Sequence, residues 1–482
     1  MSVLLFTPFG ETLTAIRRSG RYVHNGSRKI VIRAAGAPWP RVTRRLRWTA
    51  AGLFIGLCAP DPAFAAGADG TAHFGKILFA LAVLVMAAKL AGLVVERWGQ
   101  PAVLGELLVG VGLGNLVPTM FGNTGIEYVR SQPTLLVLAE VGVLILLFDV
   151  GLETDLRALL RVGWSSVLVA VIGLIAPMLL GWGAAFWLMP DSPAVAHVFM
   201  GATLSATSIG ITVRVLKELG VGQTREGQIM LGAAVLDDIL GLVVLAVVSG
   251  AVSAQSSGGP MPSALAIGGI IARAFLFLAI TVGIGRLASR HIVRFAAWTG
   301  QHDMLLIIGL ALCFSLAYAA ELIGLAGIIG ALSAGLMLDP FGEGVRARQE
   351  DATLSSLLHP LSSLFVPLFF VLMGIGVKLQ SLADPMTMAL GAVLVVCAVA
   401  GKLACIFGVV EAQVNRLAVA IGMIPRGEVG LIFAGIGANL TIQGRPILTE
   451  GAFSAIVLMV LITTLIVPIG LRWAFARSEA QA

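Results

Sequence analysis

Long apolar segments separated by short polar connections run through the chain from residue 75 onward. A bilayer core about 30 Å thick is crossed by about 20 apolar residues of helix rising 1.5 Å per residue. Read in this way, the pattern predicts an all-α polytopic membrane protein of about thirteen spans, at residues 75–95, 101–118, 133–150, 163–189, 197–216, 228–250, 263–286, 302–322, 324–338, 361–377, 388–410, 416–440 and 452–474.

The composition agrees with this prediction. Of the 482 residues, 58% are hydrophobic and only 12% are charged, whereas soluble domains carry about 25% charged residues. The net charge of +6 comes from residues 1–65, where ten Lys and Arg face Glu11 and Asp61, a local +8 that leaves −2 for the rest. The chain therefore offers no basic surface for nucleic acid.

Residues 1–65 resemble a targeting segment rather than part of the fold. A basic stretch ending at Arg47 precedes the apolar run 48–58, which is too short to span, and Ala63-Phe64-Ala65 fits a cleavage site. The mature chain would then begin near Ala66, outside the cytoplasm. The alternative is that residues 1–40 precede the true translation start.

Positive charge alternates between successive connections. Four Lys or Arg lie in one set of connections, at Lys76, Arg130, Lys378 and Arg445. Fourteen lie in the other set, at Arg97, Arg157, Arg161, Arg214, Lys217, Arg225, Arg286, Arg290, Arg294, Arg346, Arg348, Arg416, Arg472 and Arg477. Because cytoplasmic loops carry the excess of Lys and Arg, the second set should be cytoplasmic, with the mature N-terminus outside and the C-terminus inside.

An internal repeat is also indicated. The second and ninth spans both run toward glycine-rich ends, and the third and tenth end in similar sequences, LLILLFDVGLETDL and LFVPLFFVLMGIGVKL. The offset of seven helices is odd, so matching halves would enter the membrane from opposite sides. This predicts the inverted-topology repeat of secondary transporters.

The repeat pairs the fifth span with the twelfth, and both are expected to be interrupted in mid-membrane. The fifth carries the hydroxyls of Ser205, Thr207 and Ser208, which compete for backbone groups, and the twelfth carries Pro425 and Gly427. Two broken helices that cross would place half-helix ends and free carbonyls near the bilayer midplane, where a cation can be coordinated.

Two adjacent acids, Asp237 and Asp238, lie in the middle of the sixth span. An acidic residue at that depth costs about 2.5–3.5 kcal/mol, so the pair should face a partner or water rather than lipid. A transport role is the first interpretation, and a structural pair held by neighbouring helices is the alternative. Lys402, alone in the eleventh span, either pairs with Asp237 or carries a proton.

No other chemistry is visible in the sequence. The four cysteines form no CxxC, and the six histidines lie outside the centres of spans. We expect no cofactor, no disulfide framework and no resident metal.

Three motifs together, TLSATSIGITVRVLKELG, AAVLDDILGL and GMIPRGEVGLI, resemble the bacterial monovalent cation:proton antiporter family, which includes NapA-type sodium/proton antiporters, GerN and the Kef potassium-efflux proteins. The resemblance covers nearly everything from Gly75 onward. It implies an NhaA/NapA-like fold, a homodimer, and a transport half that moves like an elevator against a scaffold half. The implied domains are a targeting segment (1–65), scaffold or dimer helices (66–152 and 302–378), a linker helix (263–287) and a transport core (163–250 and 388–475).

By position in these motifs, Asp238 resembles the main carrier of cation and proton, and Asp237 resembles the neighbour that pairs with Lys402. We expect both carboxylates, carbonyls around Thr207 and a water to coordinate the cation. Arg426 and Glu428 resemble residues that stabilise the crossing. Glu106 and Asp149 are expected in the scaffold or at its boundary. One departure is Ala234, where some relatives have Ser or Thr. We also expect no appended nucleotide-binding domain of the kind usual in the Kef group.

The expected function is exchange of a monovalent cation, Na⁺ first and Li⁺ beside it, for protons across a bacterial inner membrane. A potassium/proton antiporter on the same scaffold is the nearest alternative. A passive channel would need no acid pair. An intramembrane aspartyl protease needs acids on separate helices and a Gly-x-Gly-Asp motif, which this chain lacks.

The charge bias makes the orientation testable. In a background without cysteine, Gln255→Cys should react with a membrane-impermeant maleimide from outside, and Gln349→Cys only from inside. The reverse labelling pattern would overturn both the topology and the interpretation of residues 1–65.

Overall fold

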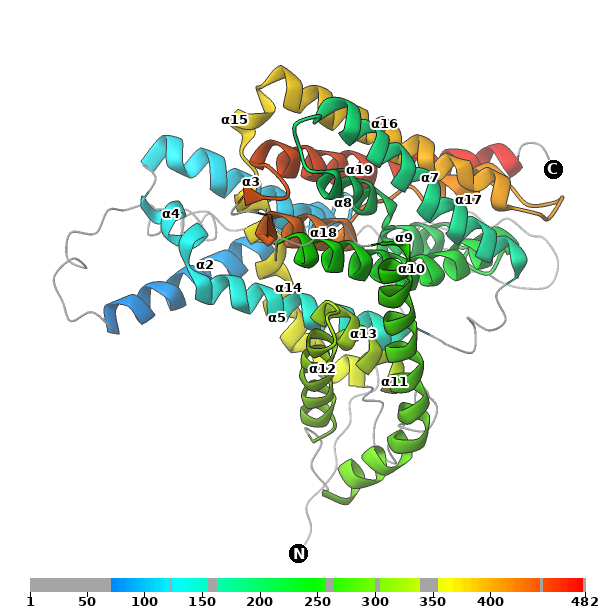
Figure 1. Ribbon diagram of the computed structural model, residues 1–482, viewed down its shortest axis with the longest axis horizontal. Coiled ribbons are helices and arrows are strands. Elements are labelled where there is room, and N and C mark those ends of the chain that lie inside the picture. The colour runs from blue at the N-terminus through cyan, green and yellow to red at the C-terminus, as the bar shows by residue number, and fades with distance from the viewer. Residues whose placement is uncertain are drawn as a thin grey trace, which may run out of the picture. The chain divides into compact units, whose positions relative to one another are not determined.

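The computed structural model describes residues 71–121, 124–154, 163–256, 263–299, 304–338, 354–442 and 445–479. The chain divides into two units, Met1–Ala51 and Gly52–Ala482, and all described residues belong to the second. The predicted targeting segment therefore lies outside the described residues. Apart from one short hairpin, every described element is a helix (Figure 1).

Seven helices come from the two ranges predicted as scaffold. The first range gives α2 (Thr71–Glu96), α3 (Ala102–Phe121), α4 (Thr124–Ser131) and α5 (Pro133–Glu153), and the second gives α12 (Met304–Leu322), α13 (Gly327–Leu338) and α14 (Leu354–Gly376). The short α4 was not predicted, because its eight residues are too polar for a span.

The ranges predicted as transport core give a second set of helices. These are α7 (Trp164–Leu188), α8 (Ala194–Ser205), α9 (Ile209–Leu219), α10 (Arg225–Ser256), α16 (Pro385–Leu403) with the 3₁₀ turn η3 (Ala404–Gly408), α17 (Arg416–Gly422), α18 (Glu428–Asn439) and α19 (Glu450–Glu479). The four-residue α15 (Leu379–Leu382) lies between the predicted scaffold and core ranges. Strands β1 (Thr441–Ile442) and β2 (Arg445–Pro446) form an antiparallel hairpin between α18 and α19, and α11 (Ala264–Thr299) follows α10.

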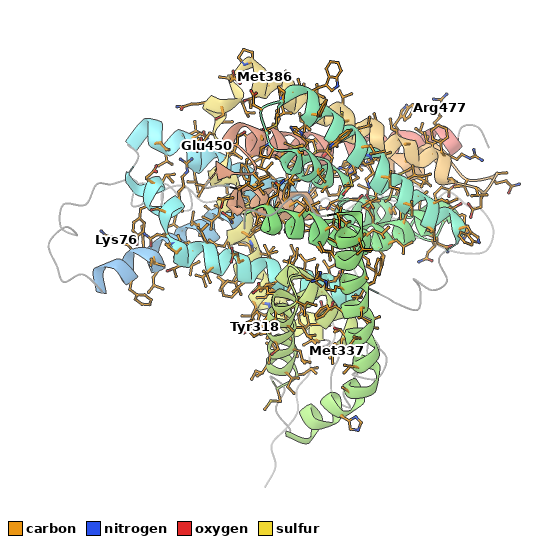
Figure 2. The ribbon with its side chains drawn as sticks, viewed as in Figure 1. Lys76, Tyr318, Met337, Met386, Glu450 and Arg477 are labelled. Carbon is orange, nitrogen blue, oxygen red and sulfur yellow. The ribbon has the colours of Figure 1, made fainter. Side chains whose placement is uncertain are left out.

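Within the described residues, nine helices are long and apolar enough to cross a membrane. Each of the thirteen predicted segments overlaps at least one described helix, and the fifth and twelfth each overlap two shorter ones. Large apolar side chains also face outward, such as Tyr318 on α12, which is 63% exposed (Figure 2). The predicted all-α polytopic class is confirmed.

Polar side chains set where the helices of the core begin. Asp384 caps α16 by accepting a hydrogen bond from the Thr387 amide at 3.0 Å, and Pro385 occupies the first helical position, where no N–H is needed. The amide and then the hydroxyl of Thr387 lower the pKa of Asp384. Asn415 caps α17 in the same way through the Ala418 amide at 3.0 Å. Both caps lie in connections between apolar segments.

Two pairs of glycines bring scaffold helices into backbone contact. A Cβ added to Gly374 of α14 would lie 2.8 Å from the Gly110 Cα of α3, and a Cβ added to Gly335 of α13 would lie 2.7 Å from the Gly151 Cα of α5. Small residues at helix interfaces allow such approach in membranes. Because α3 corresponds to α13 and α5 to α14 in the predicted repeat, the two contacts are equivalent under it.

The glycine contacts predict a local sensitivity to a single methyl group. Gly110→Ala should lower the detergent melting temperature, since overpacking typically costs about 1–3 kcal/mol. Gly112→Ala in the same helix is the matched control, because a Cβ there meets nothing within 4 Å. Equal stability of the two variants would contradict the close packing of α3 and α14.

Candidate functional site

Two interrupted helices meet inside the protein. One interruption separates α8 from α9 at residues 206–208, and the other separates α17 from α18 at residues 423–427. The Ser208 amide donates a hydrogen bond to the Pro425 carbonyl at 2.9 Å, so the two interruptions touch. Pro425 has no amide to continue a helix, and Gly427, with φ −143° and ψ −126°, is neither helical nor extended. The local sequence therefore causes the second break directly.

Arg426 holds the crossing together. Its side chain is fully buried, and Nη1 donates to the carbonyls of Ser205 at 2.9 Å and Ala206 at 2.5 Å, where α8 ends. The Thr464 hydroxyl of α19 donates to the Arg426 carbonyl at 2.7 Å. A cation is favourable at a helix C-terminus because the last carbonyls carry partial negative charge. Arg426 thus satisfies backbone groups that the break in the fifth segment releases.

Asp237 forms a buried ion pair with Lys402. The Lys402 Nζ lies 3.3 Å from both carboxylate oxygens, and both side chains are 0% exposed. Gly173 of α7 leaves room for the lysine, because a Cβ there would lie 3.2 Å from Nζ. The partner predicted from the sequence is therefore the one found in contact.

Asp238 faces different surroundings from its neighbour. It is half-buried and has no hydrogen-bond partner among the described residues. It lines a small cavity together with Glu428 and with the apolar side chains of Leu146, Leu147, Val150, Leu242 and Val429. The cavity lies between α5 on one side and α10 and α18 on the other, so one acid of the pair contacts a lysine and the other lines a small cavity.

The three hydroxyls of the first interruption have different partners. Ser205 Oγ donates to the Ala202 carbonyl at 2.7 Å within its own helix, whereas Ser208 Oγ donates to Glu428 Oε2 at 2.5 Å across the crossing. Thr207 Oγ1 is buried and has no hydrogen-bond partner in the described part of the chain. A buried hydroxyl without a partner is costly, so Thr207 has an oxygen available for a ligand.

The two remaining acids singled out in the sequence lie outside the crossing. Glu106 is buried on α3. Asp149, near the end of α5, accepts a hydrogen bond from the Ser355 hydroxyl of α14 at 2.8 Å.

A polar network that the sequence did not suggest joins three parts of the core. Glu411, in the connection before α17, accepts from the Ser165 hydroxyl of α7 and pairs with Arg225 of α10 at 2.9 Å. The Ser165 hydroxyl, and then Arg225, lower the pKa of Glu411. Glu226 Oε1 also accepts from the Asn415 amide at 3.0 Å. Since these residues are far apart in sequence, no local pattern could have revealed the network.

No group of three or more His, Cys, Asp or Glu in the described ranges could hold a metal ion. The chemistry of the site is therefore that of carboxylates, hydroxyls and backbone carbonyls at a helix crossing. Together, the apolar helices and this crossing define a polytopic membrane protein of the secondary-transporter class.

Comparison with known proteins gives the family. The sodium/hydrogen exchanger family (transmembrane) matches residues 81–477. The chain is 35% identical over 439 residues to the high-affinity Na⁺/H⁺ antiporter NhaS3 of Synechocystis sp., covering 84% of this chain and 91% of that protein. It is 34% identical over 409 residues to the Na⁺/H⁺-K⁺ antiporter GerN of Bacillus cereus, covering 84% and 97%.

The fold has a solved counterpart in the sodium proton antiporter MjNhaP1 from Methanocaldococcus jannaschii, with a TM-score of 0.64 at 16% identity, covering 84% of this chain and 98% of that one. The chain belongs to the sodium/hydrogen exchanger family. It is a multi-pass membrane transporter that exchanges a monovalent cation for protons, and it is not an enzyme. The resemblance noted in the three motifs is thereby confirmed.

The buried pair predicts a large stability effect. Lys402→Gln should destabilise the protein by about 3–5 kcal/mol, because it leaves the Asp237 carboxylate buried without a counter-charge. The matched control is Lys378→Gln, which removes an ion pair with Glu450 whose side chains are 40% and 64% exposed and should cost about 0–1 kcal/mol. Thermal melting in detergent measures both.

The double variant Asp237→Asn/Lys402→Gln should recover most of the lost stability, because neither charge is then left alone. If the double variant melts no higher than Lys402→Gln, the loss does not come from an uncompensated carboxylate.

Proposed function

We propose that this protein exchanges Na⁺ for protons by alternating access, with Asp238 as the carrier of both. The observation that supports this most is the contrast between adjacent acids: Lys402 neutralises Asp237, whereas Asp238 lines a cavity without a hydrogen-bond partner among the described residues. A carboxylate without a fixed counter-charge can take either a proton or a cation, and the same carboxylate cannot hold both at full strength.

Competition at Asp238 gives the coupling. A proton and a monovalent cation each neutralise one carboxylate charge, so one displaces the other in a site poorly screened by water. The Thr207 hydroxyl, buried without a hydrogen-bond partner in the described part of the chain, would supply a further oxygen for the cation. Lys402 would take up or release a second proton whenever its pair with Asp237 breaks and forms again.

The arrangement of the cavity supports alternating access. Its acids come from α10 and α18 of the core, and Leu146, Leu147 and Val150 come from α5 of the scaffold. The network of Ser165, Glu411 and Arg225 ties α7, α10 and the start of α17 together. A core tied in this way would move as one body along the apolar wall of α5.

For the topology, we infer thirteen spans in an inverted repeat, with the mature N-terminus outside and the C-terminus in the cytoplasm of a bacterial inner membrane. The equivalent glycine contacts, Gly110 with Gly374 and Gly335 with Gly151, support the repeat. The bias of Lys and Arg between connections supports the orientation.

We also propose that the protein works as a homodimer in contact with membrane lipid, as the family resemblance implies. Glu140 lies inside the apolar segment of α5 and is exposed, with Glu321 of α12 close enough to repel it. An acidic side chain facing lipid is costly. A second copy that covers this surface would remove Glu140 from lipid.

Potassium remains the second candidate cation, because GerN is described as a Na⁺/H⁺-K⁺ antiporter and is 34% identical to this chain. Purified protein in proteoliposomes with a trapped pH dye, given Na⁺, Li⁺ or K⁺ in turn, separates the two. A larger response to K⁺ than to Na⁺ would reverse our assignment.

The carrier is tested directly by Asp238→Asn. This variant should fold, since a charge inside the membrane is removed, and should lose cation-dependent proton movement, because an amide carries neither a proton nor a counter-charge. Proteoliposomes that keep more than half of wild-type exchange would exclude Asp238 as the carrier.

A further inference from the structure

We propose that Glu428 is a second cation-binding carboxylate, facing Asp238 across the cavity, and that it sets the affinity for the transported cation and the preference for Na⁺ over K⁺. This inference rests on the proposed function of Asp238. It changes the expectation drawn from the sequence, in which Glu428 only stabilises the crossing and Asp237 supplies the second carboxylate.

Asp238 and Glu428 line the same cavity. Asp238 lies in the middle of α10, and Glu428 is the first residue of α18, in the other half of the core, yet both line the same cavity. The five other lining residues are apolar. Among the residues that line this cavity, only Asp238 and Glu428 carry a carboxylate.

The Glu428 carboxylate has an oxygen available to a cation, whereas the Asp237 carboxylate has none. Asp237 follows the same helix as Asp238, but both of its oxygens are engaged by Lys402 at 3.3 Å and its side chain is fully buried. Its charge is already compensated. Glu428 uses one oxygen, Oε2, to accept from Ser208 Oγ at 2.5 Å, and its other oxygen has no partner among the described residues.

The helix crossing fixes the position of the Glu428 carboxylate before any cation binds. A Cβ on Gly427 would lie 2.6 Å from Ser208 Oγ, so the backbone beside Glu428 must be glycine for Ser208 to reach the carboxylate. The bond from the Ser208 amide to the Pro425 carbonyl fixes the same contact from the other side. The crossing thus fixes one oxygen of the Glu428 carboxylate beside the cavity that this residue lines.

Two carboxylates around one cation have a chemical consequence. The strength of the field from coordinating oxygens is one source of discrimination among alkali cations. A second carboxylate in the site strengthens the binding of the smaller Na⁺ more than the binding of K⁺. Loss of the Glu428 charge should therefore weaken Na⁺ binding more than K⁺ binding.

The competing explanation is structural. An acidic residue in the first turn of a helix stabilises that helix through its dipole, and Glu428 also accepts the Ser208 hydrogen bond. Glu428→Gln separates the two roles, because its amide oxygen can still accept from Ser208 but carries no charge. A structural role predicts that Glu428→Gln melts at a lower temperature and keeps its apparent affinity for Na⁺. A cation-binding role predicts that the variant keeps its melting temperature and loses apparent affinity for Na⁺.

The test uses the full chain in proteoliposomes. Glu428→Gln should raise the KM for Na⁺ about tenfold, the scale of one lost charged ligand, and should raise the KM for K⁺ less, with the maximal rate within about threefold of wild type. The matched control is Glu450→Gln, the same change in the first turn of α19 (Glu450 is labelled in Figure 2). Glu450 does not line the cavity, so this variant should leave both KM values unchanged.

A second readout does not depend on transport. Na⁺ should raise the detergent melting temperature of wild type and Glu450→Gln, but raise that of Glu428→Gln much less. Ser208→Ala, which keeps the charge and removes the hydrogen bond that orients it, should raise the KM for Na⁺ by about threefold and serves if Glu428→Gln does not fold. An unchanged KM for Na⁺ in Glu428→Gln, or in Ser208→Ala if that variant must be used, overturns the role of Glu428.

The proposed function fails by a different result. If wild-type protein moves no protons in response to any alkali cation, or if Asp238→Asn keeps its exchange, the carrier assignment is wrong. If Asp238→Asn loses exchange while Glu428→Gln behaves as wild type, only the role of Glu428 is wrong.

Discussion

The structure depends on how two interrupted helices satisfy each other's backbone. Inside a bilayer, a free N–H or C=O costs several kcal/mol, and helices avoid this cost only while they are continuous. Here the Ser208 amide bonds to the Pro425 carbonyl, and Arg426 binds the carbonyls at the end of α8. Neither interruption could stand in a membrane without the other. The crossing is therefore a single unit, and it positions Thr207, Ser208 and Glu428 of the site.

The adjacent acids Asp237 and Asp238 on α10 lie in two different chemical environments. Successive residues of a helix point about 100° apart, so adjacent acids on α10 cannot share surroundings. Asp237 points to the interior of the core and meets Lys402, while Asp238 points to the boundary with α5 and lines the cavity. The ion pair thus stabilises the core, and its neighbour remains available at the boundary. A single acid could not do both.

Features coded by neighbouring residues were predictable from the sequence, and features created by packing were not. Apolar length gave the helical segments, Pro425 and Gly427 gave the second interruption, and the cost of a lone buried charge gave the pairing of Lys402 with Asp237. Three other features depend on which distant parts of the chain pack together. They are the network around Glu411, the hydrogen bond from Ser208 to Glu428, and the close approach of Gly110 and Gly374. Such contacts join residues more than 180 positions apart, for which one sequence carries no local signal.

The distribution of charge around the cavity bears on how the site could move. The lining residues contributed by α5 are all apolar, and the two acids come from α10 and α18. If scaffold and core both supplied ligands, every displacement between them would break the site, and the cation would be released midway. With the charged ligands on the core alone, the cavity can slide past α5 without losing a carboxylate, and the apolar wall offers no competing partner. With the proposed roles of Asp238 and Glu428, this division of ligands favours a core that carries its cation as one body over a gate that opens and closes around a fixed site.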